Sequence, residues 1–247
     1  MIGKIIGIRV IKTQSNDEPP IISGRTMISD RTEKTIYGMT NIQHENMKGI
    51  VYLVVDCSGS MEGYKMSQVK QGILEFAEDA IKKEYTVGLI KFDSKATHLC
   101  EPKSSVGDLR AHLDNLVATG STNMASAIAM ANEHLSDVRY TRVMVIATDG
   151  RPDRTAFALQ AGQIAKNEGI DIITIGTDDA DVSFLQKLAT SAELGNKVSN
   201  EQFAKAIGSA HKLLPDPNRT AVQSNLSSHD LGERVQYAGR YSYSFSG

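Results

Sequence analysis

The stretch GIVYLVVDCSGS, residues 49–60, decides the fold of this chain. Its first part, residues 49–55, is an almost continuous apolar run rich in β-branched side chains, which predicts a strand buried on both faces. A polar loop follows at once, with Asp56, Ser58 and Ser60 at alternate positions. These three side chains offer only oxygen atoms, so the stretch predicts a loop that binds a hard cation at the end of a buried strand.

Outward from this stretch, apolar β-like runs alternate with helical patterns. The expected strands are 50–55, 86–92, 97–100, 142–147 and 171–175, with a weak last strand at 197–198. The expected helices are 66–82, 106–116, 123–135, 155–167, 181–189 and 200–214. This alternation predicts an α/β fold with a doubly wound, mostly parallel sheet covered by helices on both faces. The short strand 97–100 is expected to form a hairpin edge beside 86–92.

Three zones divide the chain. Residues 1–48 are a polar N-terminal extension, residues 49–214 carry the α/β pattern, and residues 215–247 are a C-terminal extension rich in Ser, Asn and Tyr. We expect a short strand at residues 4–11, which are mostly apolar, and another at 234–245, where apolar and polar residues alternate. The two strands are expected to pair in an accessory sheet. The alternative for residues 234–245 is a disordered tail.

Composition argues against several classes of partner. The net charge is -2 and 23% of the residues are charged, which gives no electrostatic case for nucleic acid or an anionic membrane surface. The chain has no apolar run long enough to span a membrane and no hydrophobic core of a signal peptide at its start. The two cysteines, Cys57 and Cys100, stand outside any zinc-binding pattern and predict free thiols in a reducing cytoplasm.

The histidines offer no recognisable ligand spacing. They are scattered along the chain at His44, His98, His112, His134, His211 and His229. Each is expected to be a surface or half-buried side chain, because a lone histidine is a weak signal for a metal ligand.

Two later segments complete the candidate cation site. Asp149 follows the expected strand at 142–147, and Thr122 lies in the loop before the expected helix at 123–135. In a doubly wound sheet, ligands bind beyond the carboxyl ends of the strands, so we expect both residues to meet the loop after Asp56. Hydroxyl and carboxylate oxygens favour Mg²⁺, Mn²⁺ or Ca²⁺ over zinc or copper.

The charge of this predicted site is incomplete. Asp56 and Asp149 supply all of its negative charge, while Ser58, Ser60 and Thr122 supply neutral oxygens. Mg²⁺ prefers six ligands and usually keeps some coordinated water. An Asp or Glu carboxylate from another protein could therefore fill an open position and add the missing charge.

Taken together, the three segments resemble the metal-ion-dependent adhesion site of von Willebrand factor A domains. The matching motifs are DCSGS at 56–60, GSTN at 120–123 and TDG at 148–150, and the order of strands and helices agrees over residues 49–214. The resemblance implies a Rossmann-like sheet with one antiparallel edge strand. It also implies that Ser58, Ser60 and Thr122 touch the metal, and that Asp56 and Asp149 act directly or through water.

The resemblance also implies a function. The family binds protein partners through the metal and is generally not enzymatic. Intracellular bacterial members serve with AAA+ ATPases of the MoxR or chelatase type, or, like the TerY-like proteins, with kinases and phosphatases in stress response or phage defence. We therefore expect a cytoplasmic, metal-dependent adaptor that captures an acidic residue of such a partner.

Two other functions are weighed against the adaptor. A Mg²⁺-dependent phosphohydrolase could use Asp56 as its nucleophile, but dehalogenase-type phosphatases have a second Asp where this chain has Ser58. No His or Lys accompanies the loops as a general base. An extracellular adhesin is disfavoured by the unpaired cysteines and the lack of a signal peptide.

Several acidic residues near the motifs have local interpretations. Asp153 is expected to cap the following helix, and the alternative is that it orients a water or a ligand of the metal. The cluster at 178–181 is expected to cap the next helix rather than form a second cation site. Asp93 and Ser94 are expected to form the hairpin turn. Met61 and Met124 flank the metal loops and could form an apolar rim for a partner.

Overall fold

A computed structural model describes residues 48–137, 139–177 and 179–218 of the 247-residue chain. The strands expected at 4–11 and 234–245 lie outside the described residues. Within the described part, no helix combines the length and the apolar character needed to cross a membrane.

The centre of the fold is a six-stranded sheet with the order β3-β2-β1-β4-β5-β6. The strands are β1 (Gly49–Asp56), β2 (Tyr85–Phe92), β3 (Ala96–Lys103), β4 (Thr141–Thr148), β5 (Asp171–Gly176) and β6 (Gly195–Lys197). Every neighbouring pair is parallel except β2 and β3, which form an antiparallel hairpin. The predicted α/β fold with one antiparallel edge strand is confirmed, and the weak last strand begins two residues earlier than expected.

Six α-helices connect and cover the strands in the described part of the chain. They are α2 (Tyr64–Lys82), α3 (Val106–Arg110), α4 (Met124–His134), α5 (Thr155–Asn167), α6 (Val182–Leu188) and α7 (Phe203–Ser209). The helix predicted at 106–116 ends at Arg110 and continues as a 3-10 turn, because this segment is rich in weak helix formers such as Gly107 and Asp114. The helix predicted at 200–214 likewise divides into α7 and flanking 3-10 turns.

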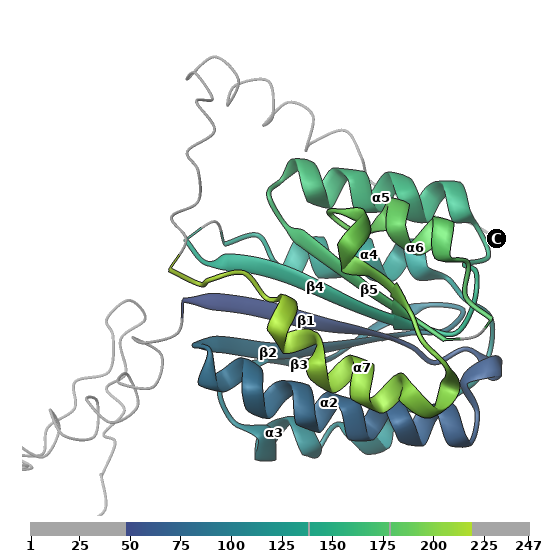
Figure 1. The fold of residues 1–247 in the computed structure, drawn as a ribbon, viewed down its shortest axis with the longest axis horizontal. Coiled ribbons are helices and arrows are strands. Elements are labelled where there is room, and N and C mark those ends of the chain that lie inside the picture. The colour runs from purple at the N-terminus through teal and green to yellow at the C-terminus, as the bar shows by residue number, and fades with distance from the viewer. Residues whose placement is uncertain (1–47, 138, 178, 219–247) are drawn as a thin grey trace, which may run out of the picture. The chain divides into compact units, whose positions relative to one another are not determined.

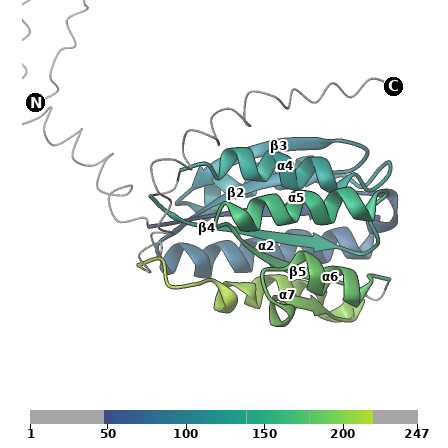
Figure 2. The same ribbon diagram turned by 90° about the horizontal axis from the view of Figure 1, so that it is seen from above.

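The helices form two layers on opposite faces of the sheet (Figures 1 and 2). On β1, Val51, Leu53 and Val55 point into the core beneath α2, α3 and α7, while Tyr52 and Val54 point into the core beneath α4, α5 and α6. All five side chains are at most 1% exposed. This two-sided burial explains why the apolar run of β1 is nearly continuous rather than alternating.

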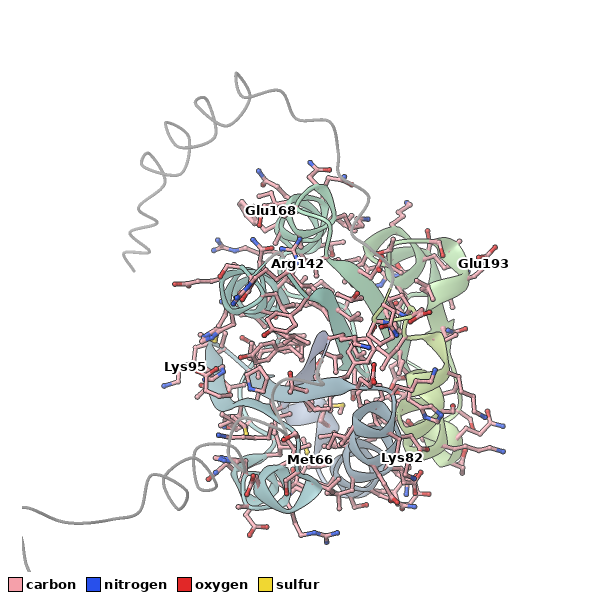
Figure 3. The ribbon with its side chains drawn as sticks, turned by 90° about the vertical axis from the view of Figure 1, so that its left-hand side faces the viewer. Met66, Lys82, Lys95, Arg142, Glu168 and Glu193 are labelled. Atoms are coloured by element: carbon pink, nitrogen blue, oxygen red, sulfur yellow. The ribbon has the colours of Figure 1, made fainter. Side chains whose placement is uncertain are left out.

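A buried arginine secures the sheet at the amino-terminal end of β4. The guanidinium of Arg142 donates hydrogen bonds to the carbonyl oxygens of Leu135 at 3.0 Å and Glu168 at 2.5 Å. These carbonyls follow the carboxyl ends of α4 and α5, where backbone acceptors have no partner within the helix. Figure 3 looks at this end of the fold, with Arg142 close to Glu168. The opposite edge, at the carboxyl ends of the strands, is left for the candidate site.

Candidate metal centre

The loop after β1 is hydrogen-bonded to the loop before α4 at the carboxyl edge of the sheet. The backbone N–H of Thr119 donates to the carbonyl of Cys57 at 2.7 Å, and the N–H of Gly59 donates to the carbonyl of Gly120 at 3.1 Å. Gly120 has a φ of 70°, and a Cβ at this position would lie 2.5 Å from the Ser94 hydroxyl oxygen. Glycine is therefore required where the two loops meet.

Asp56 is enclosed at the end of β1. Its side chain is fully buried, and one carboxylate oxygen accepts a hydrogen bond from the backbone N–H of Ser58 at 2.8 Å. The other oxygen accepts the hydroxyl of Thr148, at the end of β4, at 2.5 Å. Burial raises the pKa of Asp56 to about 6, although the hydrogen bonds from Thr148 and Ser58 oppose this rise. The charged form of Asp56 therefore gains from any cation placed beside it.

The two serines of the loop connect Asp56 to Asp149. The Ser58 and Ser60 hydroxyl oxygens lie 3.1 Å apart, and the Ser60 hydroxyl donates to Asp149 at 2.8 Å. Asp149 is 1% exposed. Four of the five predicted ligands are thus joined in one hydrogen-bonded network, although Asp149 lies 89 residues after Ser60.

Thr122, the fifth predicted residue, is held at the same edge through its backbone. Its N–H donates to both carboxylate oxygens of Asp153 at 3.1 Å, and its carbonyl accepts from the Asp153 N–H at 3.0 Å. Arg154, not Asp153, precedes the first turn of α5, so the expectation that Asp153 caps this helix is wrong. Asp153 instead fixes the Thr122 loop to the loop after β4. The alternative, that it orients a metal ligand, stays a prediction.

Sequence reasoning missed a lysine at this site. The ammonium of Lys65, in the first turn of α2, lies 2.6 Å from a carboxylate oxygen of Asp149 and 3.1 Å from one of Asp179. Burial disfavours the charged lysine, but these hydrogen bonds outweigh burial and raise the pKa of Lys65. The expectation that no lysine accompanies the loops is therefore wrong. The signal in the sequence that could have predicted this contact is the position of Lys65, about one helical turn after the DxSxS motif.

We expect Lys65→Met to increase the affinity of the chain for a divalent cation by about tenfold, or about 1.4 kcal/mol. The ammonium of Lys65 neutralises part of the negative charge of Asp149 and repels a divalent cation that approaches it. Methionine removes this positive charge but keeps the apolar part of the side chain. Calorimetric titration with Mg²⁺ measures this change. Lys82→Met, which removes an exposed ammonium from the other end of α2, is the matched control. Equal or weaker affinity in Lys65→Met would show that the lysine does not compete for the site.

Two further acidic residues, Asp181 and Asp93, have structural roles that match their local interpretations. The carboxylate of Asp181 accepts the backbone N–H of Phe184 at 3.3 Å and so caps α6. Asp93 accepts the N–H of Lys95 at 3.2 Å within the β2–β3 turn. These contacts confirm the predicted cap and turn.

The donor set fits a hard cation. Asp56 and Asp149 are buried carboxylates, and buried charge is stable only when it is paired or coordinated. Hydroxyl oxygens of Ser58 and Ser60 lie between them. Oxygen-only donors of this kind suit Mg²⁺, Mn²⁺ or Ca²⁺.

Comparisons with known proteins agree on the family. Residues 51–212, more than half of the chain, match the model of the von Willebrand factor type A domain. The fold is similar to the vWF domain of the type V pili tip protein Mfa5 from Porphyromonas gingivalis. That similarity has a TM-score of 0.62 at 12% identity and covers 68% of this chain and 95% of that one.

Curated relatives are longer than this chain. It is 24% identical over 226 residues to human inter-alpha-trypsin inhibitor heavy chain H2, covering 77% of this chain and 24% of the relative. It is 34% identical over 123 residues to the magnesium-chelatase 67 kDa subunit of Chlorobaculum tepidum, covering 47% of this chain and 20% of the relative. The chain thus spans about a quarter or less of these proteins. Together with the fold and the family match, these findings show that the chain belongs to the von Willebrand factor type A domain family.

Proposed function

We propose that the domain at residues 49–214 binds a divalent cation and uses it to hold a carboxylate of a protein partner. Mg²⁺ is the first choice, with Mn²⁺ and Ca²⁺ as alternatives. The ligands we assign are Asp56, Ser58, Ser60, Thr122 and Asp149. The observation that carries the proposal is the pair of buried carboxylates, Asp56 and Asp149, where three loops meet. They are linked through the Ser58 backbone N–H and the hydroxyls of Ser58 and Ser60.

The charge balance supports capture of an acidic side chain. Two carboxylates face a dication, but Lys65 already shares the charge of Asp149. A bound dication therefore has incomplete compensation from the protein and favours an added anionic oxygen ligand. Domains of this family are generally metal-dependent interaction modules, and the assigned residues give this chain the chemistry for that role.

The biological setting we propose is an intracellular adaptor for an ATPase or for a kinase and phosphatase system, in stress response or phage defence. Similarity to a protein named as a magnesium-chelatase subunit supports a role within a multi-subunit assembly, and the ATPase is our proposal for its partner. The cytoplasmic location stays a prediction from the two free cysteines.

A phosphohydrolase centred on Asp56 is less well supported. Both carboxylate oxygens of Asp56 accept hydrogen bonds, from Ser58 and Thr148, and the side chain is fully buried. A nucleophilic carboxylate has to reach the substrate, and this one is enclosed. Domains of this family are typically not enzymes, so the interaction module is the better-supported function.

Affinity purification with the full chain as bait tests the proposal. In Mg²⁺, wild type should retain a partner that is released by EDTA and absent with Ser58→Ala, as identified by mass spectrometry. Ser58→Ala removes one hydroxyl from the site. Ser191→Ala, at an exposed serine whose side chain makes no capping hydrogen bond, should retain the partner. Retention of the same partner in EDTA and with Ser58→Ala would mean that the metal is not the binding element.

A further inference from the structure

A second group of metal-binding side chains lies away from the centre described above. His98 and Glu101 are on β3, and His134 is the last residue of α4. One ligand atom from each lies within 4.8 Å of the others, and among the described residues no other group of three His, Cys, Asp or Glu side chains is so close. α4 begins beside the Thr122 loop and ends at His134, which puts about 15 Å of helix between the two places.

The shape of the sheet brings these side chains together. His98 and Glu101 are three residues apart, and on a regular strand their side chains would point to opposite faces of the sheet. The pairing of β3 with β2 shifts between His98 and Cys100, where β3 has one extra residue, and this bulge puts both side chains on the same face. Tyr52 reaches both ligands from β1: its hydroxyl lies 3.1 Å from Nε2 of His98 and donates to Glu101 at 3.3 Å. The tyrosine ring can cross β2 because Gly88 has no side chain there, and a Cβ would overlap the ring.

The two imidazole rings lie directly against each other. Their rings stack in parallel, with centroids 4.0 Å apart and an interplanar angle of 5°. Burial and the neighbouring His134 lower the pKa of His98. Glu101 is 3.8 Å from the nearest nitrogen of His98 and 4.0 Å from that of His134. Tyr52 holds His98 and Glu101 together, and its hydroxyl has to release Nε2 of His98 before that nitrogen can bind a metal.

We propose that His98, Glu101 and His134 form a site for a divalent transition metal of the zinc class. A set of two imidazole nitrogens and one carboxylate oxygen binds zinc better than magnesium. A water molecule would occupy the fourth position of the zinc. Ligand atoms around zinc lie about 3.3 Å apart when each bond is about 2.0–2.1 Å. To reach this spacing, Glu101, whose side chain is 63% exposed, has to move toward the histidines. At least one imidazole also has to turn, because the lone pairs of parallel rings do not point at a common position. The metal would join the edge strand β3 to the end of α4.

Zinc titration of the full chain in excess Mg²⁺ tests this site, because Mg²⁺ fills the oxygen-donor centre and competes poorly for imidazole. We expect one equivalent of Zn²⁺ to bind, and Co²⁺ to give the intense visible absorption of a tetrahedral site. Glu101→Gln and His134→Ala should each weaken Zn²⁺ binding by about tenfold or more. Zn²⁺ should also raise the melting temperature of the wild type, because it binds the folded state.

Two control variants separate this site from other zinc ligands. His112→Ala removes a histidine from the segment after α3 and should bind Zn²⁺ as wild type does. Asp56→Asn disables the oxygen-donor centre and should also leave Zn²⁺ binding intact. Unchanged affinity in Glu101→Gln and His134→Ala, or loss of the Zn²⁺ equivalent in Asp56→Asn, would overturn the proposal. Glu101 is exposed, so its substitution tests the site without disturbing the core.

Discussion

Asp56→Asn is expected to lower the affinity of the chain for Mg²⁺ by about a hundredfold or more, which corresponds to about 2.7 kcal/mol. The amide keeps one oxygen acceptor but removes half of the carboxylate charge at the centre, since only Asp56 and Asp149 supply it. In EDTA, the variant should melt at the same temperature as the wild type or higher. Burial opposes the charge of Asp56 in the folded state, and the neutral amide avoids that cost.

Calorimetric titration and thermal denaturation in EDTA measure the two effects. The matched control is Asp114→Asn, at an exposed position in the 3-10 turn after α3. It should bind Mg²⁺ as the wild type does. If Asp56→Asn and Asp114→Asn bind Mg²⁺ equally well, Asp56 is not part of a metal centre.

The affinity for Mg²⁺ should fall by about tenfold between pH 7 and pH 5, because protons compete for Asp56. The metal requires the ionised carboxylate, whose pKa is raised to about 6 by burial. In EDTA, where no metal is bound, a fall in pH is expected to raise the stability of the folded state through Asp56. The folded state binds this proton more tightly than the unfolded state, so Asp56 contributes stability that grows as the pH falls from about 6 to about 4.

Titration at a series of pH values checks the affinity, and melting curves in EDTA check the stability. The difference in melting temperature between Asp56→Asn and wild type should narrow as the pH falls, since protonation also removes the charge of Asp56. A constant affinity from pH 7 to pH 5 would contradict the raised pKa of Asp56.

Much of the fold follows from patterns that are local in the sequence. The apolar run of β1 and the alternation of strands and helices predict the doubly wound sheet, because parallel strands need crossover helices and are buried on both faces. The meeting of Asp56 with Asp149 follows from one further rule, that neighbouring parallel strands end at the same edge. Helix lengths were less predictable where weak helix formers gather, as they do after Arg110.

The features that could not be predicted from the sequence depend on contacts between residues far apart in the chain. Lys65 pairs with Asp149, 84 residues away, and nothing local to either residue shows that pairing. Asp153 looks like a helix cap from its position, but its partner is Thr122 in another loop. His98 and His134 are isolated in the sequence. Only the irregular register of β3 and the end point of α4 bring their rings together.

The ion pair between Lys65 and Asp149 has a consequence for how the protein is made. A site of two buried carboxylates would ordinarily resist folding until a cation arrived, so that a newly synthesised chain would depend on metal supply. Lys65 gives Asp149 a counter-charge from within the same polypeptide, at 2.6 Å. If the proposed cation binds here, folding and metal loading can therefore be separate events, because the chain does not need the ion to balance Asp149 while it folds.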